Sequence, residues 1–114
     1  MTGAQSVFVS SLSTSDWVPD PELPAPALMH LLCATDGVQA GLTRIDHADG
    51  PISWTPPARE VLLVVEGRAR IEVAGGEVLD LGPGDMASLP GDVATMWTVT
   101  TPFRELWVLA GAEG

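Results

Sequence analysis

The chain has 114 residues, 46% of them hydrophobic, which suits one domain with its own core and leaves too little for two ordinary domains. Five arginines against 15 acidic residues give a formal net charge of −10, so we expect neither nucleic acid nor a membrane surface as a partner. Cys33 is the only cysteine, which excludes an internal disulfide, and the lack of lysine excludes a Schiff base. Because the sequence shows neither a membrane span nor a signal-peptide pattern, we expect a cytoplasmic protein.

Residues 1–26 are polar and then rich in proline, which predicts an extended N-terminal arm. Short apolar or alternating runs follow, each bounded by Gly, Pro or Asp, as is typical of strands. They cover residues 27–34, 38–47, 60–67, 68–75, 77–85, 86–90, 94–100 and 103–110. The sequence therefore predicts an all-β sandwich or closed barrel over 27–110, with 111–114 as a C-terminal tail.

The clearest strand signal lies in RARIEV, residues 68–73, where charged and apolar side chains alternate strictly. This period of two is typical of a strand with one buried face. Gly75 and Gly76 follow at once, and paired glycines favour the positive φ values of a hairpin turn. We therefore expect a hairpin at this point.

Two motifs resemble those of a known family. Six residues separate Glu60 from Gly67, and the segment LGPGDMASLPGDVATMWTV, residues 81–99, follows a glycine-rich hairpin. In this combination the chain resembles the cupin superfamily, in particular small single-domain cupins related to the ureidoglycine aminohydrolase and ethanolamine-utilisation types. The resemblance implies a cupin jelly-roll β-barrel, also called a double-stranded β-helix, around a central pocket, and it implies a homodimer.

Metal-binding cupins carry an H-x-H pair before the motif glutamate and a further histidine in the second motif. The positions that match the pair are Trp54 and Pro56, or Ser53 and Thr55, and Thr95 matches the further histidine. None is histidine, and one carboxylate among hydroxyls is a poor set of ligands for a transition metal. We therefore expect no metal and no other cofactor. His30 and His47 lie on earlier strands and are more simply interpreted as exposed or core residues.

The resemblance implies that Glu60 faces the pocket, with Leu62 and Val64 on the same face by period two. The alternative is a surface carboxylate at the start of a strand. Among apolar neighbours, an inward carboxyl would have a raised pKa and could serve as a catalytic acid or base. Glu60 is therefore the candidate catalytic residue.

Other side chains are candidates for binding a ligand. The aromatic ones could form a flat wall or simply fill the barrel, and the cationic ones could reach the pocket or pair with surface carboxylates. The candidates are Trp54, Thr95, Trp97, Trp107, Arg44 and His47, together with Leu62 and Val64.

Two functions from different classes fit these residues. One is a metal-free enzyme of isomerase, cyclase, dehydratase or lyase type that uses Glu60 on a small organic substrate in a bacterial metabolic or natural-product pathway. The other is a module that binds a small molecule without turning it over. A metal-dependent dioxygenase or aminohydrolase is disfavoured by the missing ligands. A second polar group across from Glu60, such as Thr95, Arg44 or His47, would favour the enzyme.

Overall fold

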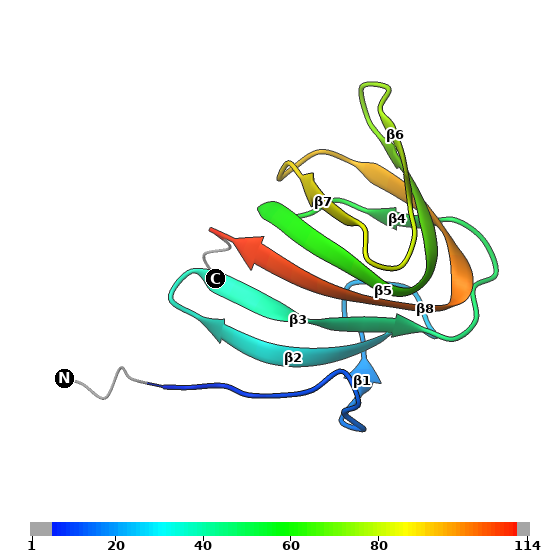
Figure 1. Cartoon of the computed structure of the whole chain (residues 1–114). Helices are drawn as coiled ribbons and strands as arrows, with labels where there is room; N and C mark the ends of the chain where they lie inside the picture. Colours follow the sequence, from blue (N-terminus) through cyan, green and yellow to red (C-terminus); the bar gives the residue numbers. More distant parts are fainter. Residues whose placement is uncertain (1–5, 112–114) are drawn as a thin grey trace.

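The computed structural model describes residues 6–111, and every regular element in this range is a β-strand (Figure 1). The strands pair antiparallel throughout, which confirms the expected all-β fold. They are β1 (Val18–Pro19), β2 (Leu28–Thr35), β3 (Val38–Ile45), β4 (Ile52–Trp54), β5 (Arg59–Val73), β6 (Val78–Leu81), β7 (Met86–Leu89) and β8 (Thr95–Ala110). None of the described residues belongs to a helix that could cross a membrane.

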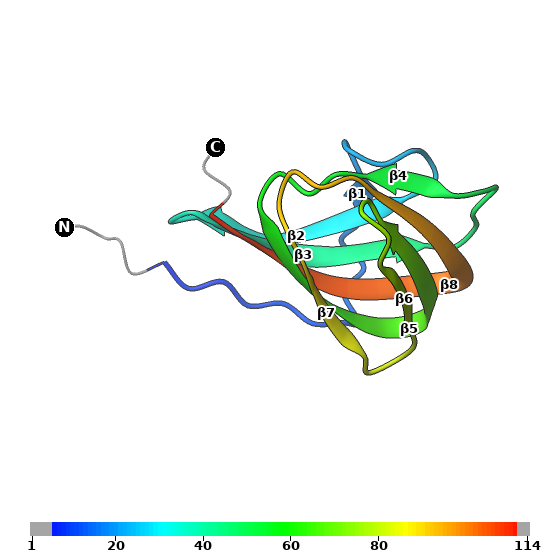
Figure 2. The ribbon, with the colours of Figure 1, turned by 90° about the horizontal axis from the view of Figure 1, so that it is seen from above.

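The sheet is folded into two layers because β5 and β8 are long enough to belong to both. In the first layer the order is β1–β2–β3–β8–β5–β7, with residues 103–110 of β8 and 59–66 of β5. In the second layer the order is β4–β8–β5–β6, with residues 95–100 of β8 and 68–73 of β5. Figure 2 shows β5 and β8 curving from one layer into the other. This is the expected jelly-roll arrangement, in which few strand edges stay open.

The sequence predicted separate strands at 60–67 and 68–75, and again at 94–100 and 103–110, and this division is wrong. Gly67 bends β5 without ending it, with a φ of 79° and a shift in register between Glu66 and Arg68. Such a bulge turns the strand while its ladder to the partner strand continues. Before the bend Glu60, Leu62 and Val64 are buried, and after it Ala69 and Ile71 are. The bulge therefore also changes which residues face the core.

The hairpin expected at Gly75 and Gly76 is confirmed. Both glycines have positive φ, 105° and 117°, and β5 pairs with β6 across them. The strand expected over 77–85 is shorter, however, because the chain turns at its end. Asp85 Oδ2 accepts a 2.8 Å hydrogen bond from the backbone N–H of Gly82, and this N–H then takes no part in a strand ladder.

The core lies between the two layers. Its most deeply buried side chains include Leu62, Val64, Ile71 and Phe103, each exposed by 1% or less. Full burial of such a side chain contributes roughly 1.5–3 kcal/mol. The rings of Phe103 and Trp97 meet edge to face, with centroids 6.4 Å apart, and so connect the two halves of β8. The core therefore holds both layers in place around the space described below.

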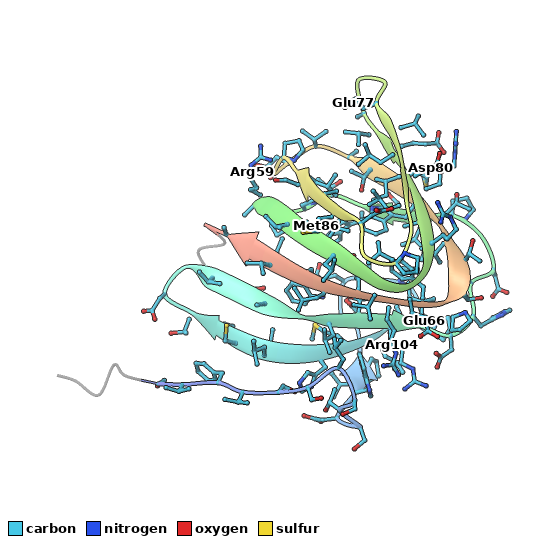
Figure 3. The ribbon with its side chains drawn as sticks, in the orientation of Figure 1. Arg59, Glu66, Glu77, Asp80, Met86 and Arg104 are labelled. Carbon is cyan, nitrogen blue, oxygen red and sulfur yellow. The ribbon has the colours of Figure 1, made fainter. Side chains whose placement is uncertain are left out.

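The segment before β1 runs along the outer side of the first layer (Figure 1). A 2.7 Å hydrogen bond joins Ser10 Oγ to His30 Nε2, and Arg104 Nη1 donates a 3.0 Å bond to the carbonyl of Leu12. The ring of Trp17 lies 5.8 Å from the guanidinium groups of both Arg44 and Arg104. Figure 3 shows Arg104 beside Glu66, whose Oε1 is 3.7 Å from its Nε. These contacts fasten residues 10–17 to the barrel wall.

Candidate functional site

A cavity of about 220 Å³ opens between the two layers. Its walls come from β2, β3, β4, β5 and β8, and from the loop that joins β1 to β2. Most of the lining is apolar, with acidic side chains at several points. The lining residues are Asp20, Pro21, Glu22, Leu23, Met29, Leu31, Ala34, Gln39, Thr43, Ile45, Ile52, Trp54, Glu60, Trp97, Val99, Phe103, Glu105, Trp107 and Leu109.

Glu60 lies at the start of β5 and points into this cavity, only 3% exposed. Its Oε1 accepts a 2.7 Å hydrogen bond from Nε1 of Trp54. Burial raises the pKa of Glu60 to about 7, while the hydrogen bond from Trp54 acts in the opposite direction. At neutral pH the carboxyl can therefore both take and give a proton.

Glu105 is a second carboxyl in the cavity, and it was not among the residues expected there. It lies on β8 between Phe103 and Trp107 and is 6% exposed. Burial raises its pKa well above the usual range, and the negative charges of Glu60 and Asp20 raise it further. The alternation Phe103, Glu105, Trp107, Leu109 could have revealed it, because these four residues share the inward face of one strand.

Three tryptophans form the apolar walls. Trp54, Trp97 and Trp107 all line the cavity with Glu60, and each indole N–H is already used inside the protein. Trp97 donates to Thr95 Oγ1 at 2.9 Å and Trp107 to Thr43 Oγ1 at 2.9 Å. Thr95 is buried but lies behind the wall, where its hydroxyl donates to the Trp54 carbonyl. Thr95 therefore positions Trp97 and Trp54 and does not line the cavity.

Arg44 and His47 were expected near a ligand, and the structure places both outside the cavity. Arg44 Nε donates to Asp46 Oδ1 at 3.0 Å, and His47 Nε2 lies 2.7 Å from Asp49 Oδ1. Each therefore has an acidic partner two residues further along the chain. The negative charge of Asp46 raises the pKa of Arg44 above its ordinary value, mainly through this hydrogen bond. The second polar group in the cavity is instead Glu105.

Leu62 and Val64 share the inward side of β5 with Glu60, as expected, but neither lines the cavity. They are 1% and 0% exposed and belong to the packed core. Their role at the site is therefore indirect, since they support the walls around it.

The residues around Glu60 do not fit a divalent metal ion. Within residues 6–111 no three His, Cys, Asp or Glu side chains come together in a way that could hold one. His30 is bonded to Ser10 and to the Asp16 carbonyl on the outer side of the barrel, and His47 pairs with Asp49. Transition metals need three or four strong ligands, and here Glu60 has an indole N–H as its partner.

Several solved structures share the fold of this barrel. Over nearly its whole length, 95%, the chain superposes on KdgF from a Halomonas species, covering 96% of that chain with 18% identity and a TM-score of 0.70. An RmlC-like cupin from Shewanella frigidimarina gives 95% and 94% coverage, 18% identity and a TM-score of 0.74. With the EutQ protein of Clostridium difficile, the superposition covers 77% of this chain and 70% of that chain, at 16% identity and a TM-score of 0.66.

At these identities the likeness establishes the fold alone. No curated protein matches the sequence. A family match is nevertheless clear: residues 41–105, more than half of the chain, match the EutQ-like cupin domain. The matched segment contains Glu60 and Glu105 together with Trp54 and Trp97. The chain belongs to the EutQ-like cupin domain family, within the cupin superfamily.

Proposed function

We propose that the chain is a metal-free cupin enzyme that moves a proton on a small organic substrate, with Glu60 as the acid or base. The observation that carries this proposal is the buried Glu60 carboxyl, whose pKa of about 7 is set by its apolar surroundings. A group that titrates near the working pH can give and take a proton within one turnover. Isomerisation, cyclisation, dehydration and elimination all need such a step.

The walls supply positioning for this chemistry. Trp97 and Trp107 present flat apolar surfaces beside Glu60, and Trp54 holds the carboxyl through its 2.7 Å hydrogen bond. A carboxylate in an apolar cavity is poorly solvated and so is a stronger base than one in water. The site can therefore abstract a proton from a weakly acidic C–H bond and return it elsewhere.

The proposal is tested with 5-nitrobenzisoxazole, a generic reporter of proton abstraction. A base removes the proton on C3, the N–O bond breaks, and the coloured 2-cyano-4-nitrophenolate forms. We expect the wild-type rate to rise with pH to a plateau above about pH 7, as Glu60 ionises. Glu60→Gln should lower kcat/KM by roughly 100-fold or more. Pretreatment with a chelator should leave the wild-type rate unchanged.

Glu77→Gln is the matched control, because it makes the same change at an exposed position beside β6, away from the cavity (Figure 3). It should retain the wild-type rate. A Glu60→Gln protein as fast as wild type would contradict the catalytic role. The second candidate function, a binding module without turnover, would then be favoured, because the tryptophan-lined cavity remains able to hold a ligand.

We also propose that the chain forms a homodimer through the outer face of the first layer. Val61, Met86 and Leu106 on this face are 44%, 72% and 38% exposed, and Figure 3 shows Met86 on β7. Val61→Glu would place a negative charge on each side of a symmetric contact. By sedimentation velocity we expect wild type to be a dimer and Val61→Glu a monomer. A monomeric wild type at high concentration would contradict the proposal.

A further inference from the structure

Glu105 has a property that the proton-transfer function does not use. Its Oε1 atom is buried and has no hydrogen-bond partner among the described residues. A buried polar atom without a partner costs about 1–3 kcal/mol, and more when it is charged. Glu105 lines the cavity, so a ligand with a hydrogen-bond donor could reach this atom.

The charges around the cavity select the sign of that ligand. Asp20, Glu22, Glu60 and Glu105 line it, and no Arg or His side chain among the described residues does. β3 and β4 contribute no charged group to the lining. An anionic ligand would meet four carboxyl groups without a compensating cation.

The donors of the cavity lead to the same conclusion. The indole N–H groups of Trp54, Trp97 and Trp107 are all bonded within the protein. Apart from carboxyls in their protonated form, Gln39 and Thr43 are the described lining side chains that can still donate. The tryptophan faces, in contrast, attract cations through their ring quadrupoles. The cavity therefore offers acceptors and aromatic faces, which suit a positively charged group.

We propose that the cavity binds an organic ammonium ion, whose N–H groups donate to Oε1 of Glu105 while its apolar part lies against the tryptophan rings. This proposal rests on the same cavity as the proposed proton-transfer function and names the class of its substrate. In strand register Glu105 pairs with Val64, four positions from Glu60 on β5. The two backbone positions are therefore roughly 13 Å apart along the strands.

The two carboxyls have different partners within the protein, and this gives them different roles. Glu105 anchors the ammonium, and Glu60, beside Trp54, is left free to exchange a proton with a more distant atom of the substrate. The other ionisable groups that line the cavity with Glu105 are Glu60 on β5 and Asp20 and Glu22 in the loop before β2. Because the ammonium favours ionised carboxyls, binding should release a proton, and affinity should rise with pH through neutrality.

The test compares three probes of similar shape, benzylammonium, benzyl alcohol and benzoate, by isothermal titration calorimetry at about pH 8. We expect benzylammonium to bind about tenfold to hundredfold more tightly than benzyl alcohol, as is typical of a hydrogen bond to a charged group. Benzoate should bind most weakly. Titrations in two buffers of different ionisation enthalpy count the protons released.

Glu105→Gln keeps the shape and an acceptor oxygen, and it should remove most of the preference for benzylammonium while changing the affinity for benzyl alcohol much less. Asp20→Asn, at the edge of the cavity, should reduce the preference less. Glu77→Gln removes one exposed charge and should change it by no more than about twofold, because surface charges are screened.

Several results would overturn the proposal: equal or tighter binding of benzyl alcohol or benzoate, a cation preference that survives in Glu105→Gln, or no benzylammonium binding at millimolar concentration. These outcomes differ from those that test the proton-transfer function. A cavity that prefers ammonium but gives no turnover dependent on Glu60 keeps this proposal and favours the binding module. Turnover that depends on Glu60, without a preference for the cation, would support the proton-transfer function and overturn the ammonium proposal.

Discussion

Glu60→Gln and Glu105→Gln are each expected to stabilise the fold above neutral pH. Folding raises the pKa of both carboxyls, so the folded protein binds their protons more tightly than the unfolded chain does. For Glu60, stability is greatest below the ordinary pKa of 4.5 and falls as pH rises to about 7. Above that pH, its ionisation costs about 3 kcal/mol relative to acidic solution.

A glutamine avoids this cost because it is neutral at every pH, and its side-chain oxygen can still accept the hydrogen bond from Trp54. At about pH 8, Glu60→Gln should therefore raise the melting temperature by on the order of 10 °C, and Glu105→Gln should change it in the same direction. At about pH 5, both variants should lie close to wild type.

Melting curves by circular dichroism across this pH range provide the measurement, with Glu77→Gln as the exposed control that should follow wild type throughout. A wild-type protein whose stability increases from about pH 5 to about pH 8 would contradict the raised pKa values of the two buried carboxyls. So would glutamine variants that are less stable than wild type at the alkaline end.

Gly67→Ala should destabilise the protein much more than Gly75→Ala. Both glycines have positive φ, 79° and 105°, so alanine at either position lowers the stability of the fold by about 1–2 kcal/mol. At Gly67 a Cβ would also collide with the backbone oxygens of Thr100 and Pro102, whereas at Gly75 nothing lies within 4 Å. The backbone there cannot move without disturbing the pairing of β5 with β8, which adds a further 1–3 kcal/mol or so.

Urea unfolding of the two variants gives the comparison. We expect a loss of roughly 3 kcal/mol or more for Gly67→Ala and about 1 kcal/mol for Gly75→Ala. Equal losses would mean that the bend at Gly67 relaxes freely, and the close approach of Gly67 to residues 100–103 of β8 would not constrain the backbone there.

Much of the fold could be predicted from sequence because its signals are local. The alternation in residues 68–73 and the glycines at 75 and 76 specified one strand and its hairpin. The continuity of β5 was not visible, because Gly67 in sequence indicates a turn equally well as a bulge, and only the partner strand decides between them. The short strands β1 and β4 were missed because they have two and three residues, too few to show a period.

The candidate site shows the same limit. Glu60 lines the cavity with Trp54, Trp97 and Trp107, all candidates from the sequence, and their roles there stay predictions. Arg44 and His47 were misplaced although their partners, Asp46 and Asp49, follow each by two residues and could have indicated surface pairs. Glu105 was missed because a glutamate among apolar residues was not weighed against its strand period, which puts it on the inward face.

The long shared pairing of β5 with β8 also determines how the chain can reach this structure. The register joins Arg59 to Ala110 at one end and Val73 to Thr95 at the other, so every rung brings together residues well separated along the chain. The chain loses conformational entropy when it closes such loops, before burial of the core can offset that loss. Folding should therefore be slow for a domain of this size, and the rate-limiting barrier should be the meeting of these two strands, with the short flanking strands joining afterwards.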